Sequence, residues 1–216
     1  VGSIAGFAEL HPEQAARYYG QAAHTNHDAI AALNTLFAQD GLVVYVPAGV
    51  ILEQPVQLIN LFRSTERLMA NRRILFVVED GASAKLLVCD HSMGDTDFLS
   101  TEVIEIFAGR DAVVDYYDLE ESSIRTRRFS SLFVEQEAGS NVLVNGITLN
   151  NGQTRNNYRA RINGEGAELT LCGMAIEDRE QRVDTYSHIS HRVPRCTSNE
   201  LFKYVLDDRA VGAFAG

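Results

Sequence analysis

Three cysteines, Cys89, Cys172 and Cys196, are the most versatile nucleophiles in this 216-residue sequence. A thiolate can carry a transferred group or bind a metal, provided that it is accessible and that a nearby cation activates it. The other interpretation of each cysteine is a small buried hydrophobic residue. Three cysteines, few and far apart, also fit a reducing compartment, so a cytoplasmic location is expected.

Two histidines, His188 and His191, lie three residues apart in "HISH". On a helix this spacing would bring both rings to one metal, whereas on a strand it sends them to opposite faces. The surrounding run "DTYSHISHRV" has β character. The sequence therefore favours hydrogen bonding at a corner over joint binding of zinc.

Two groups of arginines could form a binding surface. They are Arg125, Arg127 and Arg128, and then Arg155, Arg159 and Arg161. One interpretation is a surface for a partner or an anion. The other is charge balance against carboxylates of the neighbouring segment, namely Asp115, Asp118, Glu120 and Glu121. The formal net charge of −10 favours charge balance.

Composition and missing motifs exclude several classes of function. The negative charge argues against nucleic acid and against an anionic membrane surface as partners. The longest apolar run, "LVVYVPAGVIL", is interrupted by Pro47 and is too short to cross a bilayer. The sequence contains neither a Gly-x-x-x-x-Gly-Lys-[Ser/Thr] phosphate loop nor a Gly-x-Ser-x-Gly elbow. We therefore expect neither ATP hydrolysis nor serine-hydrolase chemistry from this chain.

The elements divide into a helical N-terminal lead, residues 1–41, and a β body, residues 42–216. Residues 12–39 are predicted to be helical, with Thr25 and Asp28 forming a capping box. Ile30, Leu33 and Phe37 would share one face, and Gly41 would end the helix in a left-handed conformation. After Gly41, β-branched and aromatic runs alternate with Gly, Asn and Asp corners.

The β body contains four similar segments: "GASAKLLVC", "GRDAVVDYY", "AGSNVLVNG" and "GEGAELTLC". They begin at Gly81, Gly109, Ala138 and Gly164, which gives intervals of 28, 29 and 26 residues. Small residues align at position four (Ala84, Ala112, Asn141, Ala167), and aliphatic residues at position six (Leu86, Val114, Leu143, Leu169). Such a period is typical of a solenoid, in which stacked coils share one core.

The same alignment interprets two further features. Gly164 and Gly166 are interpreted as a β-helix corner and not as a phosphate-binding loop. A phosphate-binding loop needs a helix directly after its glycines, whereas the following "AELTLCGMAI" alternates like a strand. Cys89 and Cys172 share position nine, opposite in parity to the aliphatic column. Only a bend in the strand would turn these two thiols inward.

Three stretches resemble the SufB/SufD family, the scaffold subunits of the SUF iron–sulfur cluster assembly machinery. They are "VVYVPAGVILEQPVQLIN" at 43–60, "RILFVVEDGASAKLL" at 73–87 and "HRVPRCTSNELFKYVLDDRAVGAFAG" at 191–216. The last stretch matches the family pattern at His191, Pro194, Ser198, Lys203 and Asp208, and departs from it at Tyr204, where the family has a small residue. The sequence is more similar to SufD than to SufB.

The resemblance implies a right-handed parallel β-helix core between helical end domains. It implies a non-catalytic scaffold that pairs with a SufB-like paralogue and with a SufC-like ATPase; a homodimer is an alternative. In the family the ATPase-docking helices and the Cys, His and Glu groups of cluster building follow the "f.G" stretch. The chain ends there, so we expect a C-terminally truncated fragment that lacks this site.

The resemblance also suggests a sulfur relay at Cys89, because SufB-like members carry a relay cysteine after this corner. A complete cluster site is not expected, because the thiols are 83 and 24 residues apart and clusters prefer close thiolates such as Cys-x-x-Cys. We expect no cofactor in this chain; the parent complex would assemble the cluster. A carbohydrate-active β-helix enzyme and a stand-alone structural solenoid remain the alternatives, although no Trp is present to stack on sugars.

Overall fold

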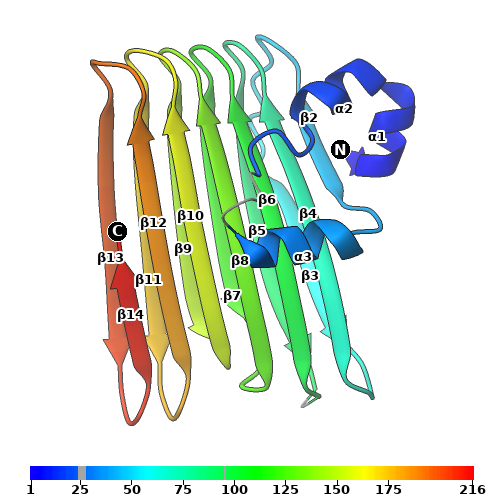
Figure 1. Cartoon of the computed structure of the whole chain (residues 1–216), viewed down its shortest axis with the longest axis vertical. Coiled ribbons are helices and arrows are strands. Elements are labelled where there is room, and N and C mark those ends of the chain that lie inside the picture. Colours follow the sequence, from blue (N-terminus) through cyan, green and yellow to red (C-terminus); the bar gives the residue numbers. More distant parts are fainter. Residues whose placement is uncertain (24–27, 95) are drawn as a thin grey trace.

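The chain forms a parallel β-solenoid of about six turns, as the repeats predicted. The structure, a computed structural model, describes residues 1–23, 28–94 and 96–216. Each coil contributes one strand to each of two facing sheets (Figure 1). Every strand pair is parallel except the first, β1 with β2, which is antiparallel.

The larger sheet, sheet A, has eight strands in the order β1 (Gly2–Ser3), β2 (Leu42–Val46), β4 (Leu68–Val78), β6 (Phe98–Ala108), β8 (Thr126–Gln136), β10 (Gln153–Ile162), β12 (Arg182–His191) and β14 (Val211–Ala215). Sheet B has six: β13 (Thr197–Leu206), β11 (Glu168–Glu177), β9 (Asn141–Asn150), β7 (Val113–Glu121), β5 (Ser83–Met93) and β3 (Val56–Arg63).

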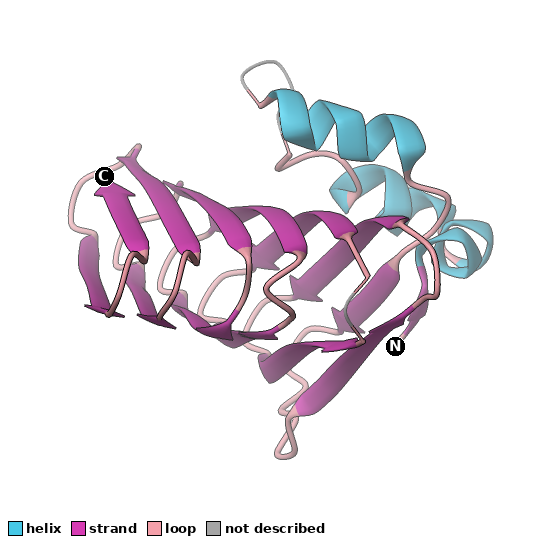
Figure 2. Ribbon diagram, turned by 90° about the horizontal axis from the view of Figure 1, so that it is seen from below, coloured by secondary structure: helices cyan, strands magenta, loops and turns pink. Residues whose placement is uncertain are grey.

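The N-terminal lead contains short helices where the sequence predicted one helix over 12–39. They are α1 (Ile4–Leu10), α2 (Pro12–Tyr18) and α3 (Ala29–Phe37), and they lie over the outer face of sheet A near its N-terminal end (Figure 2). The segment after α2 is fixed to sheet A by Glu105 of β6. This carboxylate accepts hydrogen bonds from the backbone N–H groups of residues 20, 22 and 23, at 2.9–3.0 Å. Glu105 also accepts from Arg73, at 2.8 Å.

The third helix differs from its prediction in its N-cap and in its buried face. Asp28 is the N-cap, its side chain accepting from the N–H groups of Ile30 and Ala31, whereas Thr25 of the predicted capping box lies outside the described residues. The buried face carries Ala31 and Asn34, not the predicted Ile30, Leu33 and Phe37. Asn34 decides this orientation because its amide donates to the carbonyls of Arg72 and Thr101.

The predicted stop at Gly41 is wrong as well. The helix ends at Phe37, and Gly41 does not adopt a positive φ. Gly41 is needed for space: a Cβ there would lie 2.5 Å from the carbonyl oxygen of Arg73.

The corners repeat, but at positions other than the predicted columns. Left-handed backbone occurs at Gly49, Gly81, Asp111, Gly139, Gly166 and Arg195, so Gly166 is a corner as predicted. Asp111, not Gly109, occupies the corner of its coil. Consequently Val114 stacks between Ala84 and Val142, and Leu169 follows Val142 in the same column, so the predicted column with Leu86 and Leu143 is wrong.

The interior between the sheets has two chemically different halves. In β5, the inward row runs from Ala84 through Leu86 and Val88 to Asp90, and in β7 it passes from Tyr116 to Asp118. In sheet A the order along each strand is reversed: in β6 the charged residue, Glu102, comes before the aliphatic residue, Ile104. We call the aliphatic side the apolar half and the side with buried charges the ionic half.

Candidate functional site

The ionic half contains a set of buried charges that we call the ionic cluster: Arg72, Asp90, Glu102, Asp118, Glu120 and Arg128. The six side chains come from strands β4 to β8, where even numbers belong to sheet A and odd numbers to sheet B. Each strand delivers them because its inward alternation continues past the aliphatic residues. The cluster therefore joins successive coils and both sheets.

Arg128 lies at the centre of the ionic cluster. Its guanidinium contacts all four carboxylates: Glu102 at 2.9 Å, Asp90 at 3.4 Å and Glu120 at 3.6 Å, together with a direct hydrogen bond to Asp118. Arg72 forms a two-pronged pair with Asp90, both distances being 2.6 Å, and also contacts Glu102 at 3.1 Å. Two guanidinium groups thus face four carboxyl groups.

Burial and the two arginines shift the pKa values of these carboxyl groups in opposite directions. Burial raises the pKa of Asp118 to about 7, against the attraction of Arg128. Burial also raises the pKa of Glu120. Burial would do the same to Asp90, but Arg72 and Arg128 together lower its pKa. Asp118 can therefore hold a proton near neutral pH while Asp90 remains ionised.

A second perturbed carboxyl lies at the edge of the ionic half. Burial, followed by repulsion from Glu120, raises the pKa of Glu177 in β11 to about 7. Among the side chains that the structure describes, no group of three or more His, Cys, Asp and Glu residues is arranged to hold a metal ion. The geometry supports a proton-holding, coil-joining role for this half of the interior.

Cys89, the predicted relay thiol, lies on the outward side of β5 and is 3% exposed. Its register neighbours are Ile59 and Leu119, and the amide of Gln57 donates to its sulfur at 3.7 Å. The thiol is thus separated by its strand from the adjacent, inward-facing Asp90. Its relay role stays a prediction, and the structure adds that its sulfur is covered.

The other predicted thiols and histidines do not converge on Cys89. Cys172 is in register with Asn145 and Leu201, not with Cys89, so their predicted shared column is wrong. Cys196 lies at a corner, where its thiol donates to the carbonyl of Gly164 at 3.2 Å. His191 exchanges a 2.9 Å hydrogen bond with Ser198 across the next corner, which confirms corner bonding for that ring.

Most of these arginines form ion pairs, and the interpretation as a binding surface stays a prediction. Arg128 is buried in the ionic cluster and balances Asp118 and Glu120, as the charge-balance interpretation predicted. Arg125 pairs with Asp97, an acid that the sequence did not single out. Arg127 and Arg155 lie on the outer face of sheet A.

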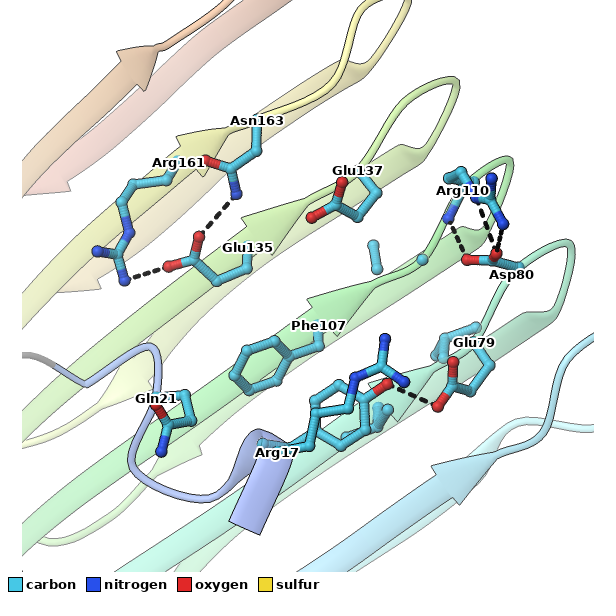
Figure 3. A pocket seen from close by; sticks show the side chains of 15 residues that line it. Arg17, Gln21, Glu79, Asp80, Phe107, Arg110, Glu135, Glu137, Arg161 and Asn163 are labelled. Atoms are coloured by element: carbon cyan, nitrogen blue, oxygen red, sulfur yellow. Dashed lines mark hydrogen bonds and ion pairs between the residues drawn. The ribbon is translucent and has the colours of Figure 1, made fainter. Parts of the chain in front are cut away.

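A cavity of about 620 Å³ lies where the helical lead meets the corners after β4, β6 and β8 (Figure 3). Glu79 accepts hydrogen bonds there from Tyr18 at 2.6 Å and from Tyr45 at 2.9 Å. Burial, followed by the Glu79 hydrogen bond, raises the pKa of Tyr18. Asp80 pairs with Arg110 at 2.6 Å. Of these contacts, the hydrogen bond from Tyr18 of α2 to Glu79 joins the lead to the solenoid, whereas the other two lie within the solenoid.

Comparison with known protein families finds two family models that match this chain. Residues 61–216 match the family model described as "SUF system FeS cluster assembly, SufBD core domain", and residues 1–58 match "SufBD protein N-terminal region". The chain belongs to the SufBD family. This confirms the predicted SufB/SufD resemblance, while the closer similarity to SufD stays a prediction.

Individual SufBD proteins are similar at low identity over most of the chain. An iron–sulfur cluster assembly SufBD family protein of Synechocystis sp. is 25% identical over 213 residues, covering 94% of this chain and 47% of the relative. The chloroplastic protein ABCI7 of Arabidopsis thaliana is 26% identical over 190 residues, covering 83% and 39%. A Staphylococcus epidermidis SufBD family protein is 26% identical, covering 87% and 40%. The chain thus spans less than half the length of these relatives.

Sequence reasoning named Asp118, Glu120 and Arg128 but missed the other three members of the ionic cluster, Arg72, Asp90 and Glu102. The signal for Asp90 was present in the alternation of β5, where Asp90 continues the inward row of Ala84, Leu86 and Val88. A charged residue in such a row marks a buried partner in the adjacent coil. No helix in the described part of the chain is long and apolar enough to cross a membrane.

Proposed function

We propose that this SufBD chain belongs to a non-catalytic scaffold subunit of a SUF iron–sulfur cluster assembly complex. The observation that carries the proposal is the match of the SufBD core model to residues 61–216, which contain almost the entire solenoid. The ionic cluster supports it, since paired charges from successive coils suit a rigid platform. The iron–sulfur cluster is then cargo of the complex and not a resident cofactor of this chain.

The proposed partners are a SufB-like paralogue and a SufC-like ATPase, in the cytoplasm. A SufD-like role predicts that the partner solenoid is a SufB-like chain, whereas a homodimer would replace it with a second copy. The ATPase contact is expected from parts of the parent protein beyond these residues. Cys89 would relay sulfur only if movement of β3 or β7 uncovers it, because both flank it now.

The test is affinity purification of the tagged full-length parent from its own cells, with iron and sulfide assayed in the eluate. We expect an ATPase and a homologous solenoid chain in stoichiometric amounts. An untagged strain carried through the same steps is the control. Recovery of a lone monomer, above all one that cleaves a polysaccharide, would contradict the proposal and favour the carbohydrate-active alternative.

A further inference from the structure

The outer face of sheet A carries a group of arginines that we call the arginine face: Arg127 on β8, Arg155 and Arg159 on β10, and Arg182 on β12. The helices cover the same sheet only toward its N-terminal end, and β10 and β12 lie bare in Figure 1. In a chain of net charge −10 this concentration of one sign stands apart from the rest of the composition.

Most charges of this chain are paired, but three on the arginine face are not. Arg155 pairs with Asp184. Arg127, Arg159 and Arg182 form no ion pair with any residue that the structure describes. The Nε of Arg159 is moreover buried without a hydrogen-bond partner in the described part. An unpaired guanidinium group on a surface can bind an anionic ligand without first breaking an internal ion pair.

Two members of the arginine face, Arg155 and Arg159, are also held in place. The guanidinium groups of Arg155 and Arg159 lie over the ring of Tyr186, at 5.8 and 5.5 Å from its centroid. Cation–π contacts of this kind restrict the two side chains before any ligand arrives. Less conformational entropy is then lost on binding.

The spacing of the unpaired arginines selects the kind of ligand. Arg127 and Arg182 lie in one row, separated by the strand that contains Gln153, which puts them roughly 10 Å apart. Arg159 lies three rows further along, roughly 20 Å away. A single phosphate cannot reach all three. An extended chain of carboxylates can.

We propose that the arginine face binds an acidic segment of another protein. Asp184 and Glu135 interrupt the face, and the overall negative charge repels the dense phosphates of a nucleic acid. Sparse carboxylates on a polypeptide fit between those acids. This binding does not depend on the proposed scaffold role.

The test measures binding of a fluorescein-labelled peptide, in which glutamates are spaced by glycine and serine, to the full-length chain by fluorescence anisotropy at low salt. Replacing Arg127, Arg159 and Arg182 by Gln should weaken binding at least about tenfold, and added salt should weaken it in the natural protein. The matched control replaces the exposed Arg63, Arg67 and Arg125 by Gln, with the same change in net charge; its effect should stay below about twofold.

Each contrary result would overturn the proposal. Equal losses in both triple variants would show non-specific attraction. Absence of binding by the natural protein would remove the acidic ligand. A single-stranded oligonucleotide that binds more tightly than the glutamate peptide, and loses affinity in the same triple variant, would assign the face to nucleic acid. Circular dichroism and thermal melts of both variants ensure that the comparison is between folded proteins.

Discussion

The apolar half and the ionic half of the interior are built by the same strands and obey different rules. In the apolar half, Leu86 stacks between Val56 and Tyr116, and a different aliphatic residue of similar volume would keep that contact. In the ionic half, Arg128 contacts four carboxylates from three other strands, so its removal would leave buried carboxylates without their main counter-charge. The apolar half thus stabilises the stack of coils by burying side chains, and the ionic half fixes the register between coils.

Breaking the ionic half at its centre should have the largest effect. Arg128→Leu leaves four buried carboxyl groups without their main counter-charge, and we expect a loss of about 4 kcal/mol in the free energy of unfolding. Urea denaturation measures this. Arg125→Leu, an exposed arginine nearby, should cost less than about 0.5 kcal/mol. Similar costs for both would remove the distinction between the ionic half and the surface.

Breaking the apolar half should cost somewhat less. Leu86 is fully buried in the aliphatic core, and Leu86→Ala should lower the free energy of unfolding by about 3 kcal/mol through lost burial and a cavity. Leu87→Ala, half-buried on the outward side of the same strand, is the matched control and should cost less than about 1 kcal/mol. A cost for Leu86→Ala above that for Arg128→Leu would reverse the order proposed for the halves.

The pH dependence sharpens the comparison, because only the ionic half titrates. The pKa of Asp118 is raised to about 7 from an unfolded value near 4, so its contribution is present at low pH and is lost as the pH rises through about 7. Asp118→Asn should therefore gain about 2 kcal/mol relative to the natural chain between pH 5 and pH 8.

Urea denaturation of both proteins across this range measures that gain. Glu168→Gln, an exposed residue of β11, should instead run parallel to the natural chain. A constant difference between Asp118→Asn and the natural chain would show that Asp118 titrates alike in the folded and unfolded states.

The corners serve both halves, and altering one should have the smallest effect. Gly166 has a φ of +73°, so Gly166→Ala places a side chain in left-handed backbone at a cost of about 1 kcal/mol. No atom blocks the new Cβ, so strain alone decides the result. Gly2→Ala, also in open space and without a positive φ, should be neutral in the same thermal melts. Equal melting temperatures for all three proteins would contradict the corner argument.

The solenoid could be predicted because each coil repeats the same corner and aliphatic pattern. The columns could not, since successive left-handed corners at Gly81, Asp111, Gly139 and Gly166 lie 30, 28 and 27 residues apart. A fixed template starting at glycine misplaces Gly109 and shifts Leu143 by one position. The coils differ in length by up to three residues, and only the backbone pairing between coils shows where the longer coils accommodate them.

The lead and the candidate site were harder to predict for one shared reason. Glu105 ends α2 through backbone contacts from more than 80 residues away, and Arg128 finds Glu102 in the preceding coil. Neither contact is visible in a local window of sequence. The prediction of charge balance around Arg128 succeeded because Asp118 and Glu120 are near in sequence as well as in space.

The contacts of Glu105 have a practical consequence for anyone shortening this chain. Arg73 and the loop after α2 together satisfy a carboxylate that is 1% exposed. A version beginning at Leu42 would strip away the three amides and uncover Val103 and Phe133 beside it. The uncovered sheet would then expose these two apolar side chains, and Glu105 would keep only Arg73 as a partner. Deletion series should therefore start from the C-terminal end of the chain.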